Sequence, residues 1–490
     1  MIFRGSIVVL MVLGIISQGA GQAPGNAPAK AEAELPRPFP NAFAHAPTPI
    51  PDRIILTWAA DPATTQAVTW RTDTSVKRGQ AQITLSEPGN DFAPHRKKEV
   101  PDPEKVRKVA ATTTLLNTNL GQAHYHSVQF HGLKPDTKYL YRVGDGVNWS
   151  EWFEFHTAKN KPARLRFIYL GDAQNDLKSH WSRVIRGAFS DMPKADFILH
   201  AGDLVNRDSA DDEWGEWFYA GGWINGMIPC VATPGNHEYG PGKKLTKHWR
   251  ACFTFPENGP PGLEETVYSI DIQGVRLISL NSNEQVEEQV PWLEAQLKQN
   301  PQRWTIVTFH HPIYSTARGR DNPQVRKHWR PLFDRYGVDL VLQGHDHTYG
   351  RSGLMREDNL LEGINLKDQG TVYVVSVSGP KMYTLEPRPW MVSSAMNTQL
   401  YQLITVDGDR LHFESRTANG SLYDEFELRK TASGRNQLVE RSQLDRERQQ
   451  VIPVPSPAED SSSQTGLAIG VLVALAAMAT VLRAARFGSL

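Results

Sequence analysis

Five short segments of the chain combine glycine or apolar residues with acidic, amide and imidazole side chains that can bind metal ions. The segments are Gly171-Asp172-Ala173-Gln174, His200-Ala201-Gly202-Asp203, Gly235-Asn236-His237-Glu238, Phe309-His310-His311-Pro312 and Gly344-His345-Asp346-His347. Carboxylate and amide oxygens together with imidazole nitrogens form a mixed ligand set, which suits Zn, Fe or Mn better than copper or calcium. Glycine beside such residues allows the backbone to turn sharply and pass close to a metal cluster. The segments therefore predict a metal centre assembled from loops.

The pair His345 and His347 illustrates how one segment can serve two neighbouring ions. The two residues lie two positions apart at the predicted end of a strand, so both rings point to the same side. Taken singly, an aspartate in these segments would more often cap a helix, and a histidine would more often be a hydrogen-bonded core or surface residue. The ordered recurrence of these residues favours a shared metal centre over such separate roles.

From about residue 164, short apolar strands alternate with helical segments. Strands are expected at 166–170, 197–199, 228–233, 275–280, 305–309 and 338–342, and helices at 178–188, 289–298 and 325–336. This alternation predicts a layered α/β domain. Each metal-binding segment directly follows one of the strands, where the loops of an open α/β sheet gather. Two further β-rich stretches, 371–379 and 401–427, close the predicted domain.

The preceding part of the chain, residues 53–157, has a different pattern that consists mostly of strand. A Pro135-Asp136 turn leads into a strand in which Tyr139, Tyr141 and Val143 face the same way. This is the tyrosine-corner pattern of a β-sandwich. The segment resembles a fibronectin type III-like domain, so we expect an all-β sandwich followed by the α/β domain.

The five segments, in their order, resemble those of the calcineurin-like metallophosphoesterases, and the β-sandwich before them makes the purple acid phosphatases the nearest match. The resemblance covers residues 51–430 and implies two divalent or trivalent metal ions, of Fe, Zn or Mn. It assigns Asp203 as the bridging ligand, Asp172 and His347 to the first ion, and Asn236, His310 and His345 to the second. It also implies that His237 contacts the phosphate and protonates the leaving group, which makes His237 and Asp203 the catalytic residues.

The reaction implied by the resemblance is hydrolysis of a small phosphate ester by a metal-bound hydroxide. Two cations lower the pKa of a bound water, in favourable cases towards about 7, and take up charge on the phosphoryl oxygens. A phosphomonoester is the first expectation, as for an acid phosphatase, and a phosphodiester or a nucleotide pyrophosphate is the alternative. A surface adhesion protein is the non-enzymatic alternative, but all six ligand positions hold ligand-capable residues.

The chain departs from the purple acid phosphatase pattern at two places. Asn206 stands where that family has a tyrosine, so we expect a colourless enzyme in which Asn206 either binds metal or supports a ligand. The loop after His310 carries Arg318 and Arg320 where the family often has histidines. Guanidinium groups suit phosphate oxygens, so either arginine could bind substrate, while two solvated loop arginines are the alternative.

Composition and the chain ends bound the remaining expectations. The 490 residues have a formal net charge of +0, so no global field attracts nucleic acid, and two cysteines, Cys230 and Cys252, allow one disulfide or two buried thiols. The expected organisation is a signal peptide (1–23), a linker (24–46), the sandwich (47–160), the catalytic domain (161–430), a polar linker (431–465), a transmembrane helix (466–482) and a cytoplasmic tail (483–490). The catalytic domain would then lie outside the cytoplasm, with the C-terminal helix either retained or cleaved. The oligomeric state stays open.

Overall fold

The computed structural model describes residues 40–86 and 105–440. The expected signal peptide, transmembrane helix and cytoplasmic tail lie outside these residues, as do most of the two expected linkers, and they stay predictions. Among the described helices, none combines the length and the hydropathy needed to cross a bilayer.

The N-terminal part of the described chain is a β-sandwich, as the sequence predicts. Its two layers are built from the strands β1 (Asp52–Thr57), β2 (Gln66–Thr72), β6 (Gly121–Phe130) and β5 (Thr112–Thr118), and from β4 (Arg107–Ala110), β3 (Gln80–Leu85), β7 (Lys138–Gly144) and β8 (Phe153–His156). The tyrosine corner is formed, because the Tyr139 hydroxyl accepts a hydrogen bond from the Lys134 backbone N–H at 2.8 Å. Tyr141 and Val143 are fully buried between the layers.

The catalytic part contains two large sheets, which confirms the predicted layered α/β domain. One run of strands is β24 (Asn436–Glu440), β23 (Leu422–Lys430), β22 (Arg410–Thr417), β21 (Leu400–Asp407), β9 (Leu165–Leu170), β10 (Phe197–His200) and β11 (Cys230–Ala232). The other sheet orders β14 (Tyr268–Ile272), β15 (Val275–Ser279), β16 (Trp304–Thr308), β17 (Leu340–Gln343), β19 (Val372–Val375), β18 (Tyr349–Ser352) and β20 (Met391–Ala395). A small hairpin pairs β12 (Tyr239–Gly240) with β13 (Lys244–Leu245).

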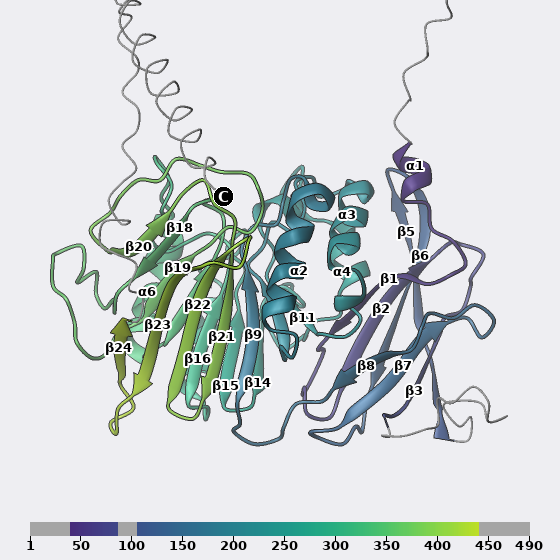
Figure 1. Ribbon diagram of the computed structural model, residues 1–490, viewed down its shortest axis with the longest axis horizontal. Helices are drawn as coiled ribbons and strands as arrows, with labels where there is room; N and C mark the ends of the chain where they lie inside the picture. The colour runs from purple at the N-terminus through teal and green to yellow at the C-terminus, as the bar shows by residue number, and fades with distance from the viewer. Residues whose placement is uncertain (1–39, 87–104, 441–490) are drawn as a thin grey trace, which may run out of the picture. The chain divides into compact units, whose positions relative to one another are not determined.

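Helices pack on the sheets and at the boundary with the sandwich. They are α1 (Asn41–Ala44), the π-turn η3 (Leu177–Trp181), α2 (Ser182–Asp191), α3 (Asp211–Gly221), η4 (Gly222–Ile224), η5 (Asn236–Glu238), α4 (Lys247–Cys252), α5 (Val290–Lys298) and α6 (Pro323–Tyr336). Helix α2 packs on β9 and β21 (Figure 1), whereas α3 contacts β1 and α4 contacts β2, β5 and β6. The helices α3 and α4 therefore join the catalytic part to the sandwich.

The two parts also share a sheet, which the sequence pattern did not indicate. Strand β1 of the sandwich pairs in parallel with β11 of the catalytic part through Thr57 and Cys230. The resulting sheet has 11 strands and runs from β24 to β5. The hydrogen-bonded β-structure is thus continuous from one part to the other.

One local feature differs from the sequence expectations. The first residues of the expected polar linker 431–465 form β24, which pairs antiparallel with β23. Asn436 is buried and Leu438 is partly buried in this strand, but its apolar residues do not alternate, so its sequence carries little periodic signal. Of the two alternatives left open for Cys230 and Cys252, the structure shows two free, buried thiols, and burial raises the pKa of both.

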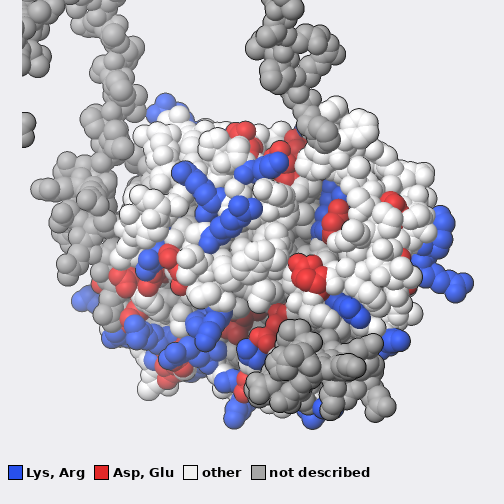
Figure 2. Space-filling model, turned by 45° about the vertical axis from the view of Figure 1, so that its right-hand side comes forward, with Lys and Arg blue, Asp and Glu red and all other residues white. Residues whose placement is uncertain are grey.

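Charged side chains of both signs lie on the face of the molecule drawn in Figure 2. Figure 2 shows basic and acidic groups interspersed over the face in view, as the balanced composition would suggest. With a formal net charge of +0, no global field of either sign acts on a charged ligand.

Candidate metal centre

The strands of both sheets bring the five metal-binding segments together. The segments follow β9, β10 and β11 in one sheet and β16 and β17 in the other. Strands β9, β10 and β11 run parallel, and so do β16 and β17. Because the carboxyl ends of parallel strands lie at the same edge, their loops meet there.

The ligand atoms form two overlapping groups that share Asp203. In the first group, the ligand atoms of Asp172, Asp203 and His347 all lie within 4.8 Å of one another. In the second, the same limit holds for Asp203, His310 and His345. A carboxylate common to both groups is the arrangement that two neighbouring ions with a bridging ligand would require.

Asn236 belongs beside the second group. Its side-chain Oδ1 lies 3.2 Å from Nε2 of His310, which in turn lies 3.2 Å from Oδ2 of Asp203 and 3.1 Å from Nδ1 of His345. The structure thus places all six residues that the sequence singled out as ligands in one cluster.

Backbone geometry at the cluster is unusual and directs the side chains inward. Asp203, His345 and His347 have φ values of 51°, 76° and 46°, in the left-handed region that non-glycine residues rarely adopt. Each such residue costs about 1–3 kcal/mol, and such residues concentrate at functional sites. Gly235 is required close by, because a Cβ there would lie 2.2 Å from Oδ1 of Asp203.

Hydrogen bonds to backbone carbonyls fix two of the imidazole rings. Nδ1 of His310 donates to the Ala201 carbonyl at 2.9 Å, and Nδ1 of His347 donates to the Lys381 carbonyl at 2.9 Å. Each bond leaves Nε2 directed at the carboxylates, as in histidines that bind metal through Nε2.

The charge balance of the cluster fits bound cations. Asp172 is 0% exposed and its Oδ1 has no hydrogen-bond partner, and burial raises its pKa well above the usual value. Burial disfavours the charged form of His310, but Asp203 and Asp172 outweigh that effect and raise its pKa to about 9. The proton on His310 therefore supplies positive charge that a metal ion would otherwise supply.

Glu238 organises the loop that carries Asp203, a role that the sequence left undecided. Its carboxylate accepts backbone hydrogen bonds from Asp203, Leu204 and Gly235 at 2.7–2.9 Å. Burial, together with the nearby Asp203, raises the pKa of Glu238 to about 7. The segment after β10 is thus tied to the segment after β11 at the point where both contribute ligands.

Three residues at the centre were missed in the sequence. The amide Nε2 of Gln174 lies 2.6 Å from Oδ2 of Asp203 and 3.2 Å from Nε2 of His347, inside the first group. Lys381 donates from Nζ to Oε1 of Gln174 at 3.3 Å. The Tyr383 ring lies 4.6 Å from the His347 ring. Gln174 stands in a recognised segment, but nothing near Lys381 and Tyr383 in the sequence marked them.

The residues predicted to bind substrate differ in their placement. Nδ1 of His237 donates to the Asn206 carbonyl at 2.5 Å, and its backbone N–H donates to Oδ1 of Asp203 at 2.9 Å. Arg320 reaches the centre, where its guanidinium donates to the His345 carbonyl at 2.8 Å. Arg318 is exposed and bonds through its backbone to Thr384. Of the two arginines, the structure brings only Arg320 into contact with the ligand-bearing loops.

Asn206 and His311 both lie close to the cluster. Asn206 acts through its backbone, whose N–H donates to Oε2 of Glu213 at 2.7 Å and whose carbonyl holds His237. The His311 ring packs 4.1 Å from the His345 ring, and its Nδ1 lies 2.9 Å from the Ser282 hydroxyl. Whether the Asn206 side chain binds metal stays a prediction.

Comparison with known families agrees with this architecture. Residues 165–349 match the calcineurin-like phosphoesterase family, and residues 51–157 match the N-terminal domain of purple acid phosphatases. Fold, clustered ligands and family match together define a metal-dependent phosphoester hydrolase with a dinuclear centre.

Within this class, the chain is similar to proteins named as acid phosphatases and purple acid phosphatases. The chain is 24% identical over 436 residues to acid phosphatase type 7 of Homo sapiens, which covers 80% of this chain and 94% of that protein. It is 29% identical over 263 residues to purple acid phosphatase 21 of Arabidopsis thaliana, covering 51% and 57% of the two chains. The structure of purple acid phosphatase PPD1 from yellow lupin superposes with a TM-score of 0.66 at 18% identity, over 79% of this chain and 75% of that one. The chain is a purple acid phosphatase-like member of the calcineurin-like metallophosphoesterases.

Proposed function

We propose that this protein hydrolyses phosphomonoesters at a centre of two metal ions. The observation that carries the proposal is the sharing of Asp203 between two groups of ligand atoms, beside the cationic side chains of Arg320 and Lys381. Asp172, Asp203 and His347 would hold one ion, and Asp203, Asn236, His310 and His345 the other. The mixed ligand set suits Fe, Zn or Mn. Such ions, when bound, supply an activated water and neutralise charge on the phosphoryl group.

His237 is proposed as the residue that protonates the leaving group. Its Nδ1 is engaged by the Asn206 carbonyl, and among the described residues its Nε2 has no hydrogen-bond partner. The half-buried ring also lies beside the bridging carboxylate, since its backbone N–H donates to Asp203. With Nδ1 held in this way, Nε2 is the nitrogen that delivers a proton to the departing oxygen.

Two cations at the edge of the centre support a preference for monoesters. The Arg320 guanidinium and the Lys381 ammonium lie 4.9 Å and 5.6 Å from the centroid of the Tyr383 ring, which packs on His347. A monoester carries up to about two negative charges near neutral pH, since its second pKa is about 6, whereas a diester carries one. The added positive charge therefore favours the monoester more than the diester.

Parallel assays with p-nitrophenyl phosphate and bis(p-nitrophenyl) phosphate test the proposal. The monoester should have the higher kcat/KM, and Lys381→Met should lower the monoester value about 10-fold while lowering the diester value much less. Lys298→Met, which removes the same charge from the exposed end of α5, is the control. Preferential hydrolysis of the diester by the unmodified protein would overturn the monoester assignment.

A further inference from the structure

We infer that Glu213 is a positioning residue for His237, and that the β-sandwich holds Glu213 in place through Asp211. The inference rests on the proposed function of His237. It assigns the sandwich a role in the reaction, although the sandwich contributes none of the six clustered ligand residues.

Two carboxylates bind five consecutive backbone N–H groups of the segment that follows β10. Glu238 accepts from residues 203–205, and Glu213 accepts from Asn206 at 2.7 Å and from Arg207 at 2.8 Å. Glu213 also pairs with the Arg207 side chain at 2.7 Å. Glu238 therefore fixes the half of the segment next to the ligand Asp203, and Glu213 fixes the half next to His237.

The peptide group between Asn206 and Arg207 connects Glu213 to His237. Its N–H donates to Oε2 of Glu213, and its carbonyl accepts from Nδ1 of His237 at 2.5 Å. Because a peptide group is planar, the bond to Glu213 sets the direction of the carbonyl. A bond on one side of the group also polarises and strengthens the bond on the other. Glu213 thereby orients the imidazole without touching it.

The position of Glu213 depends on the first turn of α3, which is bonded to residues of the sandwich. Asp211, the first residue of α3, bonds Arg53 of β1 at 2.6 Å and Arg71 of β2 at 3.3 Å, with all three side chains 3% exposed. Asn119, in the turn between β5 and β6, accepts from the Asp211 backbone N–H at 2.8 Å. Three elements of the sandwich therefore fix the helix end from which Glu213 projects two residues later.

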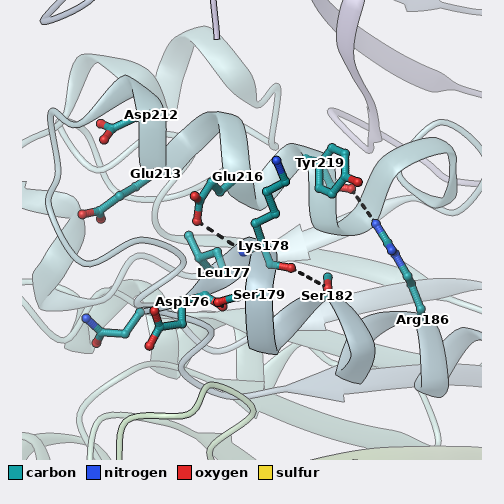
Figure 3. Close-up of a pocket in the computed structure, with 11 residues that line it drawn as sticks. Asp176, Leu177, Lys178, Ser179, Ser182, Arg186, Asp212, Glu213, Glu216 and Tyr219 are labelled. Carbon is teal, nitrogen blue, oxygen red and sulfur yellow. Dashed lines mark hydrogen bonds between the residues drawn. The ribbon is translucent and has the colours of Figure 1, made fainter. Parts of the chain in front are cut away.

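The same helix offers a matched control. Glu213 and Glu216 both line a cavity of about 540 Å³ between η3 and α3 (Figure 3). Glu216 accepts a hydrogen bond from the backbone N–H of Lys178 at 3.3 Å and, among the described residues, makes no hydrogen bond with the loop that carries Asn206. Glu216→Ala thus removes the same charge from the same cavity wall and leaves the peptide group that holds His237 unchanged.

The experiment compares two substrates that transfer the same phosphoryl group but differ in leaving group. p-Nitrophenolate leaves readily without a proton, whereas the alkoxide of β-glycerophosphate needs one. A general acid typically contributes about 10²–10⁴-fold, so we expect Glu213→Ala to lower kcat for β-glycerophosphate about 10–100-fold. We expect less than about 3-fold loss for p-nitrophenyl phosphate, unchanged KM for both, and partial rescue by Glu213→Gln, which keeps an acceptor oxygen.

His237→Ala separates failure of this inference from failure of the proposed function. If His237→Ala lowers kcat equally for both substrates, the assignment of His237 as proton donor is wrong, and the inference about Glu213 is wrong with it. The other case is that His237→Ala lowers kcat mainly for β-glycerophosphate. The positioning role of Glu213 is then wrong if Glu213→Ala lowers kcat equally for both substrates, leaves both values unchanged, or gives the same values as Glu216→Ala. Metal content and thermal unfolding are measured for each variant, and loss of metal from Glu213→Ala would also contradict the inference.

Discussion

The metal centre and the junction between the sandwich and α3 both bury carboxylates, but they balance charge in opposite ways. At the junction, burial opposes ionisation of Asp211, yet His248, Arg53 and Arg71 prevail and lower its pKa. At the centre, burial raises the pKa of Asp172 against the attraction of His310, and Asp203 adds to the rise. At the junction, cationic side chains of the protein balance the carboxylate charge. At the centre, the protein supplies too few cationic groups to balance the carboxylates, so bound metal ions would have to do so. Similar residues thus build a structural contact in one place and a ligand-dependent site in the other.

The largest effect is expected from removing Asp203, the carboxylate that both ligand groups share. Asp203→Ala should lower kcat/KM at least about 10³-fold, the scale of losing a main source of electrostatic stabilisation. Metal content should fall from two ions per chain to one or none, as measured by mass spectrometry of the purified protein. Activity that persists near the original level would contradict the bridging role.

A substitution of Asp211 tests whether the junction between the sandwich and α3 depends on its own charge pairs. Asp211→Asn should lower the free energy of unfolding by about 3–5 kcal/mol, because it leaves Arg53 buried without its carboxylate, whereas Arg71 keeps Asp52. Urea unfolding followed by circular dichroism measures the change, and the metal content of the folded variant should not fall.

Asp172→Asn is the matched variant at the centre. In the metal-free protein it should change the free energy of unfolding by less than about 1 kcal/mol, because Oδ1 makes no hydrogen bond and its ion-pair distances to Nε2 of His347 and His310 are long, at 3.8 and 4.0 Å. It should instead abolish most of the stabilisation that added metal gives the unmodified protein. A loss as large as that of Asp211→Asn would show that the two sites balance charge alike.

A buried imidazole in the sandwich extends the comparison to pH. His126 is 0% exposed, and its ring nitrogens bond the hydroxyls of Thr72 and Thr113. Burial lowers its pKa to about 4; His124 lowers the pKa further, and Asp145 opposes the change. The unfolded chain binds this proton below about pH 6.5. Stability is therefore retained above that pH and is lost as pH falls towards 4, by about 2 kcal/mol after allowance for solvent screening. His310, which faces carboxylates, shifts in the opposite direction.

Unfolding measured between pH 4 and pH 7 checks the contribution of His126. His126→Gln keeps hydrogen-bonding groups but cannot titrate, so its free energy of unfolding should fall less steeply on acidification. Equal slopes for the variant and the unmodified protein would assign the acid sensitivity to other groups.

The residues of the cluster could be recognised in the sequence because each follows a strand of clear apolar pattern. Asp172 and Asp203 need only the rule that neighbouring parallel strands bring their carboxyl-end loops together. Lys381 reaches the same place from a loop after β19, with neither a glycine-flanked acid nor a recognisable spacing beside it. Its position depends on how the two sheets face each other, which local patterns do not encode.

The two loop arginines show the same limit at closer range. Arg318 and Arg320 were equivalent in the sequence, but Gly319 turns the chain with a φ of 72° and leaves Arg318 exposed while Arg320 contacts His345. The link from Asp211 through Glu213 to His237 was likewise invisible, because it joins residues from several elements through backbone groups. Side-chain chemistry can be read along the chain, whereas such relays require the packed fold.

The pairing of β1 with β11 has a consequence for attempts to shorten the protein. A chain that began after the sandwich would leave β11 as an open sheet edge, with unpaired N–H and C=O groups beside the uncovered side of α3 and α4. Open edges of this kind recruit strands from other molecules. The catalytic half produced alone is therefore expected to aggregate rather than to yield a smaller soluble enzyme.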